Sequence, residues 1–216
     1  MTCRAFPGMP PIDFRLLLVT DRHQIGPRSL PLVLQQAIRA GNMAIQLRER
    51  DLMTRDLVAL AREVRTITAA HSVRLLVNDR VDLTLALHLD GVHLRANSFS
   101  AAVARRLLGP NRLIGVSTHS IEEVLQANRD GADYVMFGPI FDTLSKRPFG
   151  TPRGVRELAE ACRRSTAPVF AIGGVMSERV PDVRQAGAYG IAVIGAVFAR
   201  EDVAAATGEL LRALES

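Results

Sequence analysis

The sequence predicts a single-domain α/β fold, a (β/α)8 or TIM barrel, in which eight parallel strands alternate with helices. Eight short apolar segments occur along the chain, and each is followed by a segment with helical periodicity. Such wholly apolar strands are typical of a parallel sheet that is covered by helices. Near the C-terminus, the segments 170–175 and 190–195 both contain glycines at the point where a strand passes into a helical pattern. This arrangement is typical of the phosphate site at the end of such a barrel.

Four strand–helix units are predicted in the first half of the chain. Residues 1–14 include Pro7, Pro10 and Pro11 and are expected to form an irregular extension, so that the barrel spans residues 15–216. Short apolar runs predict the strands, and apolar residues repeated every three or four positions predict the helices. The predicted strands are 15–19, 43–47, 74–77 and 91–94, followed by helices at 29–40, 54–70, 81–87 and 100–108.

Four more units complete the predicted barrel. Ser120 and Glu123 form a capping-box pattern at the start of one helix. A long loop, bounded by Pro139 and Pro152, precedes the next helix. A doubly wound sheet is the competing fold, but it would normally show fewer strands and a glycine fingerprint after the first one. The predicted strands are 113–116, 134–137, 169–172 and 191–194, followed by helices at 120–130, 155–164, 177–186 and 202–214.

Composition narrows the class of protein. A chain of 216 residues with 48% hydrophobic residues can form one substantial core. We find no apolar stretch of membrane-spanning length and no signal-peptide pattern at the start, so a cytoplasmic protein without a membrane partner is expected. Cys3 and Cys162 lie far apart in sequence, which indicates neither a disulfide nor a metal site.

The net charge of +5 comes largely from arginine. A basic protein can bind nucleic acid or small phosphorylated substrates. Here the arginines are spread over many predicted helices and aromatic residues make up only 5% of the chain. We therefore expect small anionic substrates and no nucleic acid.

Candidate site residues follow the strands, because chemistry in these barrels takes place at the carboxyl ends of the strands. Arginine, lysine, amide and hydroxyl groups dominate there, which suits a phosphate ester or a diphosphate. Two alternatives stay open: a solvated loop charge at Lys146, and an ion pair between Arg48 and Glu49. The candidate substrate-binding residues are Gln46, Arg48, Arg50, Asn78, Ser117, Thr143, Ser145 and Lys146, and the candidate phosphate-binding residues are Gly173, Gly174, Ile194 and Gly195.

Six motifs occur in a specific order along the chain. They are QLRER at 46–50, VNDRVD at 77–82, GVHL at 91–94, IGVSTHS at 114–120, ADYVMFGPIF at 132–141 and AIGG at 171–174. In order and spacing they closely resemble the thiamine phosphate synthase and TenI-like superfamily, from about the first strand to the eighth. The resemblance implies a (β/α)8 barrel with a role in thiamine biosynthesis, and it allows a homodimer.

The superfamily has two main activities. Thiamine phosphate synthase joins a hydroxymethylpyrimidine diphosphate to a thiazole phosphate and releases pyrophosphate. The resemblance implies that this activity uses Mg2+, with Asp79 as a metal ligand. A second metal carboxylate of the synthase pattern is replaced by Ser98, a common lysine by Arg50, and a serine near the end of the last strand by Gly195. Asp79 alone could still hold Mg2+ through substrate phosphates.

These departures favour the TenI-like branch, whose characterised activity is a thiazole tautomerase that needs no metal or other cofactor. It aromatises a carboxythiazole phosphate by moving a proton, and His119 stands at the position of the proton carrier. A neutral imidazole can accept a proton from one ring atom and return it to another. We prefer the tautomerase, with the synthase as the alternative. A second alternative is a non-catalytic barrel that binds a phosphate ligand.

Overall fold

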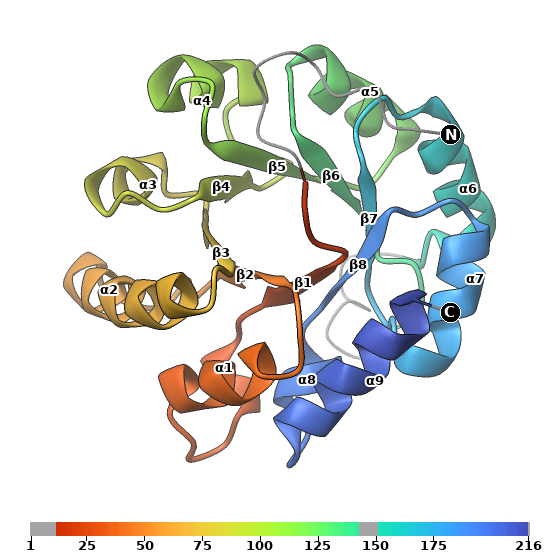
Figure 1. Ribbon diagram of the computed structural model, residues 1–216. Coiled ribbons are helices and arrows are strands. Elements are labelled where there is room, and N and C mark those ends of the chain that lie inside the picture. Colours follow the sequence, from red (N-terminus) through yellow and green to blue (C-terminus); the bar gives the residue numbers. More distant parts are fainter. Residues whose placement is uncertain (1–11, 143–150, 216) are drawn as a thin grey trace.

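The computed structural model describes residues 12–142 and 151–215. Eight parallel strands close into one barrel, and each strand pairs with its neighbours in sequence, β1 with β8 included. Figure 1 looks along the barrel, with the helices forming a ring around the strands. The predicted single-domain (β/α)8 barrel is confirmed.

Each strand is short and almost completely buried, because helices cover its outer face and other side chains fill the barrel interior. β5 is two residues longer than predicted, so that Ser117 and Thr118 belong to the strand itself. The strands are β1 (Leu16–Val19), β2 (Ala44–Leu47), β3 (Arg74–Asn78), β4 (Gly91–Leu94), β5 (Leu113–Thr118), β6 (Tyr134–Phe137), β7 (Val169–Ile172) and β8 (Gly190–Val193).

The helices follow the predicted order, with two additions at the last units. A 3-10 turn, η3 (Ser177–Arg179), precedes α7, and a short helix, α8, follows β8 directly. Another 3-10 turn, η1 (Arg22–Gln24), follows β1. No described helix is both long and apolar enough to cross a membrane. The helices are α1 (Leu30–Ile38), α2 (Thr54–Ala70), α3 (Val81–Ala86), α4 (Ala101–Leu108), α5 (Ile121–Arg129), α6 (Gly154–Arg164), α7 (Val180–Gln185), α8 (Gly195–Phe198) and α9 (Val203–Glu215).

The core has two parts, one between the strands and the helices and one inside the barrel. Phe14 precedes β1 and belongs to the inner part, where its ring contacts the rings of Tyr134 and Phe170 near the amino ends of their strands. Gly115 leaves room for the Tyr134 ring, because a Cβ there would lie 2.1 Å from the Tyr134 Cζ. The amino end of the barrel is therefore filled with apolar groups, and polar side chains gather toward the carboxyl end.

Candidate active site

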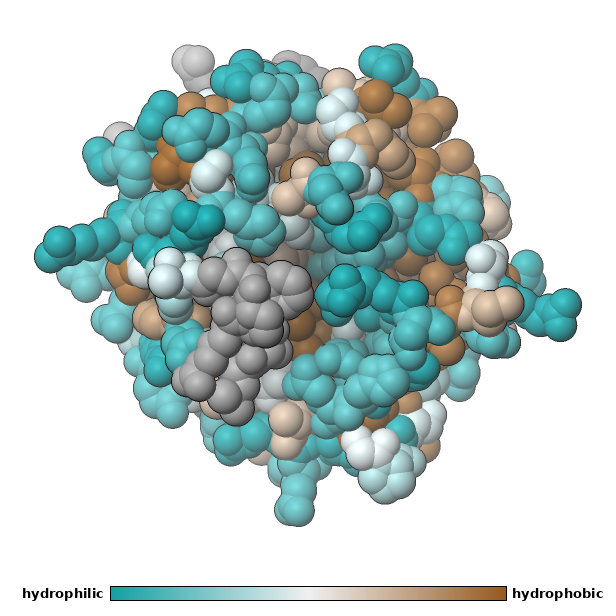
Figure 2. Space-filling view, turned by 180° about the vertical axis from the view of Figure 1, so that it is seen from behind, coloured by the Kyte–Doolittle hydropathy of each residue, from teal (hydrophilic) through white to brown (hydrophobic). Residues whose placement is uncertain are grey.

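The carboxyl ends of the strands form the face that Figure 2 shows, opposite the face seen in Figure 1. Hydrophilic side chains surround a hollow in this face, and hydrophobic atoms are visible inside it (Figure 2). This is the end of the barrel at which (β/α)8 enzymes carry out their chemistry.

A pair of amides lies at the ends of β2 and β3. The Gln46 Nε2 donates a 3.0 Å hydrogen bond to the Asn78 Oδ1. Gln46 is 2% exposed, and its Oε1 has no hydrogen-bond partner among the described residues. An unpaired buried carbonyl oxygen costs about 1–3 kcal/mol. A ligand that brings an N–H group to this oxygen would remove that cost.

Arginines gather beside the amides. Arg48 is half-buried, and burial is the main cause that lowers its pKa; the positive charges of Arg50 and Arg95 lower it further. The charges of Arg50 and Arg95 are thus both close enough to act on the Arg48 guanidinium group. Such a cluster suits an anion with several charges, because guanidinium groups bind phosphate oxygens in pairs.

Asp79 is the predicted metal ligand, and it is already paired. Its Oδ2 lies 2.5 Å from the Nε of Arg95, and the Asp79 backbone is held in the left-handed region with φ 63°. In the described part of the chain, no three His, Cys, Asp or Glu residues are grouped so that they could hold a metal ion. Ser98 is neutral, and one carboxylate neutralised by an arginine is a poor ligand set for Mg2+. The described residues therefore do not fit a resident metal ion.

Glycine loops follow β7 and β8, as predicted. Gly173 and Gly174 both have a left-handed backbone, with φ 97° and 66°. A Cβ at Gly173 would lie 2.6 Å from the Pro139 Cβ, so the loop packs closely against the segment after β6. Ile194 caps α8, which begins at Gly195. The first N–H groups of a helix have no partner within it, so these loops can direct backbone donors toward a phosphate.

His119 follows β5 and is exposed. Its Nδ1 lies 2.6 Å from the carbonyl oxygen of Gly138, which can only accept, so the proton resides on Nδ1. Ser120 caps α5 by accepting from the Glu123 N–H, as the capping-box pattern predicted. The Glu123 carboxylate accepts the N–H of His119. Among the described residues, the Nε2 of His119 has no hydrogen-bond partner.

A chain of three hydrogen-bonded polar side chains lies inside the barrel and was not predicted from the sequence. His93 lies on β4 and is 1% exposed. Its Nδ1 lies 2.9 Å from the Tyr134 hydroxyl, and its Nε2 lies 2.8 Å from the Ser117 Oγ. The alternation of side chains along a strand could have revealed these contacts. His93, Ser117 and Tyr134 lie on three neighbouring strands, each at a position whose side chain points into the barrel.

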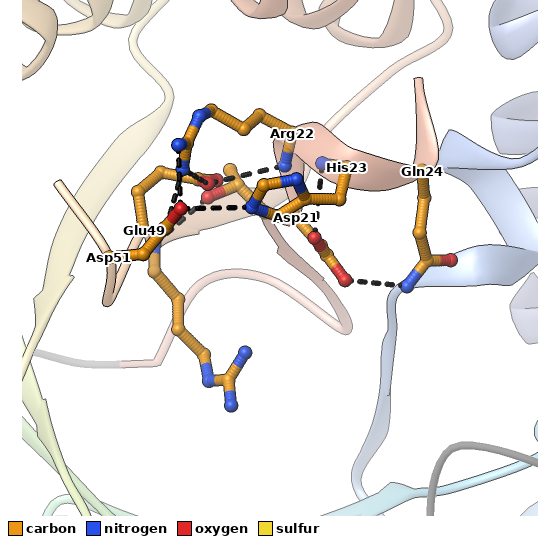
Figure 3. A network of polar contacts seen from close by, with 8 residues as sticks. Asp21, Arg22, His23, Gln24, Glu49 and Asp51 are labelled. Atoms are coloured by element: carbon orange, nitrogen blue, oxygen red, sulfur yellow. Dashed lines mark hydrogen bonds and ion pairs between the residues drawn. The ribbon is translucent and has the colours of Figure 1, made fainter. Parts of the chain in front are cut away.

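A network of polar contacts joins the loops after β1 and β2 (Figure 3). Arg22 contacts Glu49 and forms two hydrogen bonds with Asp51, which also contacts His23. The alternative ion pair between Arg48 and Glu49 is therefore wrong, because Arg22 takes the buried carboxylate. The backbone N–H of Arg48 donates to the Thr20 Oγ1 at 2.9 Å, which fixes the start of the β2 loop.

Three predicted binding residues, Thr143, Ser145 and Lys146, lie outside the described residues. The structure places the others at one end of the barrel: Gln46 on β2, Arg48 and Arg50 after it, Asn78 at the end of β3, Ser117 on β5, Gly173 and Gly174 after β7, and Ile194 and Gly195 after β8.

Comparison with known proteins shows what the chain is similar to. The family model described as thiamine monophosphate synthase (TMP-TENI) matches residues 16–197. A thiamine-phosphate synthase from Chloroflexus aurantiacus is 45% identical over 205 residues, covering 95% of this chain and 94% of the relative. One from Roseiflexus castenholzii is 44% identical over 193 residues, covering 89% of this chain and 85% of the relative.

A solved structure, the thiamine phosphate pyrophosphorylase from Pyrococcus furiosus, superposes with a TM-score of 0.85 at 35% identity. The match covers 94% of this chain and 96% of that chain. These relatives support an enzyme and the synthase alternative, and they do not favour the preferred tautomerase. That preference rested on a few rim positions, Arg50 and Ser98 above all, whereas the similarity extends over the whole barrel. The chain belongs to the thiamine monophosphate synthase family.

Proposed function

We propose that the protein is a thiamine-phosphate synthase that joins a hydroxymethylpyrimidine diphosphate to a thiazole phosphate and releases pyrophosphate. One observation carries the proposal: a hydrogen-bonded amide pair, the buried Gln46 and the half-buried Asn78, lies beside a cluster of arginines. Amides suit a neutral heterocycle, and arginines suit the diphosphate attached to it. A second anion site, at the glycine loops after β7 and β8, would hold the thiazole phosphate.

The chemistry is a displacement. A bond forms between the thiazole nitrogen and the methylene carbon of the pyrimidine, while the C–O bond to the diphosphate breaks and its electron pair leaves with pyrophosphate. Negative charge therefore grows on the leaving group. Arg48 and its neighbours Arg50 and Arg95 supply fixed positive charge at that place, which stabilises the transition state more than the ground state.

Positioning is the second contribution. The closed barrel places β8 beside β1, and β1 beside β2, so the glycine loops and Arg48 lie at the same end of the barrel. Holding both substrates at the same end of a rigid barrel replaces a chance encounter in solution by a fixed approach. The loop contacts that hold Arg22, Glu49 and Asp51 together keep the β2 loop in place.

Magnesium is implied by the family, but the donor set does not fit a resident ion. The carboxylate of Asp79 is held by Arg95, and Ser98 adds no charge. No step of the proposed mechanism is therefore assigned to a metal.

The test is an assay of the purified full-length protein with both substrates, following thiamine phosphate and pyrophosphate. We expect both products in equal amounts, and a loss of at least 100-fold in kcat/KM in Arg48→Ala. Arg62→Ala, on the exposed face of α2, is the matched control and should keep the wild-type rate. A parallel sample receives carboxythiazole phosphate alone. Isomerisation of that compound without any formation of thiamine phosphate would overturn the proposal.

A further inference from the structure

We propose that His93 is a positioning residue for this reaction: a hydrogen-bond chain from the Tyr134 hydroxyl through His93 fixes the Ser117 hydroxyl as a donor toward the diphosphate. The inference rests on the proposed synthase function for the identity of the acceptor. The direction of the chain rests on the structure alone.

The chain begins at Tyr134, inside the apolar part of the barrel. Phe14, Leu17 and Phe170 belong to the same cluster, and the Tyr134 side chain is completely buried. Among the described residues, the Nδ1 of His93 is the only hydrogen-bond partner of the hydroxyl, at 2.9 Å. Burial also raises the pKa of Tyr134, so the phenol keeps its proton. The hydroxyl must donate to Nδ1, since otherwise its proton would be buried without an acceptor.

The direction of the bond from Tyr134 to His93 also fixes the direction of the bond from His93 to Ser117. The His93 ring is buried, and among the described residues its two nitrogens contact only the hydroxyls of Tyr134 and Ser117, so the neutral imidazole with one proton is favoured. Because Nδ1 accepts from Tyr134, that proton is on Nε2. The Nε2–H then donates to the Ser117 Oγ at 2.8 Å. A neutral histidine with both nitrogens engaged has no freedom to change tautomer.

Ser117 ends the chain at the site. Its Oγ accepts from His93, so its own proton is free to point away from the imidazole. Ser117 is half-buried at the carboxyl end of β5. Arg48 follows β2, and Asp79 follows β3 with its backbone N–H donating to the His93 carbonyl at 2.9 Å, so both lie at the same end of the barrel as Ser117. An anion bound by Arg48 would thus meet a hydroxyl that is already oriented to donate, with no cost of reorientation during the reaction.

The first experiment measures the tautomer directly. Nitrogen-15 NMR of the histidine rings in the ligand-free protein should show His93 protonated on Nε2 throughout pH 6–8, and Tyr134→Phe should shift it toward a mixture of tautomers. Protonation of His93 on Nδ1 in the wild type would overturn the inference. This readout does not depend on any activity, so it stands even if the proposed synthase function fails.

The second experiment is a double-mutant cycle on kcat/KM. Ser117→Ala should lower kcat/KM by 10- to 100-fold, and Tyr134→Phe by 3- to 30-fold. In the Ser117→Ala background, Tyr134→Phe should have little further effect, because the donor that it orients is absent. Equal effects of Tyr134→Phe in both backgrounds would overturn the inference.

The chain offers a matched control. Tyr189 is its other tyrosine, and its hydroxyl donates to the Ile12 carbonyl at 2.7 Å, before the first strand. Tyr189→Phe also removes a hydroxyl from the amino end of the barrel, so it should lower stability while leaving kcat/KM unchanged. A loss of kcat/KM in Tyr189→Phe equal to that in Tyr134→Phe would show that the effect is merely structural.

Discussion

Asp79 and Arg95 form a close ion pair at the rim of the barrel, with the carboxylate Oδ2 2.5 Å from the guanidinium Nε. Asp79 follows β3 and Arg95 follows β4, so the pair links two neighbouring strand ends. Asp79 is 15% exposed and Arg95 48% exposed, which leaves the arginine accessible to an incoming anion. The pair explains why one carboxylate of this site is a poor partner for a free metal ion.

The first prediction concerns magnesium. Because Asp79 is neutralised and Ser98 is uncharged, we expect the ligand-free protein to show no measurable Mg2+ binding by calorimetry at millimolar concentrations. Ser98→Asp should strengthen the binding of Mg2+ to the ligand-free protein by roughly fivefold, which corresponds to about 1 kcal/mol for one added charge in a solvated site. Asn97→Asp adds the same charge at the exposed residue before Ser98 and is the control. Tight Mg2+ binding by the wild type would contradict this account.

A second prediction concerns the unpartnered oxygen of Gln46. Gln46→Met keeps the length of the side chain and removes both polar atoms. The KM for the pyrimidine diphosphate should rise by about 10- to 100-fold, as expected when a buried hydrogen bond to the substrate is lost, while the KM for the thiazole phosphate stays constant. Gln36→Met, on the exposed face of α1, should change neither value. A rise in the KM for the thiazole phosphate alone would show that this substrate, and not the pyrimidine diphosphate, binds at Gln46.

The glycine at the start of α8 gives a third prediction. A Cβ at Gly195 would lie 2.8 Å from the Oε1 of Gln24, the end of a flexible side chain, so Gly195→Ala should fold with nearly the wild-type melting temperature. The added methyl group would stand among the backbone donors and should raise the KM for the thiazole phosphate several-fold. Gly26→Ala, where a Cβ meets nothing within 4 Å, tests the cost of a left-handed backbone alone. If Gly195→Ala left that KM unchanged, the phosphate would not bind there.

Stability should depend on pH through His93. Its pKa is about 3 in the folded protein and about 6.5 in an unfolded chain, so between these values only the unfolded state binds the proton. The free energy of unfolding should therefore fall as the pH falls below 6.5, by at most about 1.4 kcal/mol per pH unit from this residue. Urea unfolding at pH 7.5, 6.5 and 5.5 measures the slope. His93→Gln should make the slope shallower, and an unchanged slope would show that other groups cause it.

Much of the fold could be predicted locally. The segment 54–70 is helical as predicted, and β4, β6 and β7 have the predicted ends, because periodicity and apolar runs are properties of neighbouring residues. α8 was not predicted, since four residues give too short a pattern. The candidate residues on β2, β3 and β5 could be placed at one face because the strand ends of a (β/α)8 barrel meet there.

Contacts between distant residues could not be predicted in this way. Sequence spacing suggested that Glu49 pairs with Arg48, but the structure brings Arg22 from the β1 loop to it. The resemblance implied that Asp79 is a metal ligand, whereas the structure pairs its carboxylate with Arg95. In both cases the competing partner comes from another strand end, and side-chain geometry decides between them.

By itself, the sequence determined the order of strands and helices, the barrel they form, and the polar residue types at its carboxyl end, because these depend on local pattern and on the fixed rules of parallel strand packing. Only the tertiary structure decided which polar groups meet. His93 shows the difference: the sequence marks it as buried, while the hydrogen bonds to Tyr134 and Ser117 that give it a direction exist only after β4, β5 and β6 lie side by side.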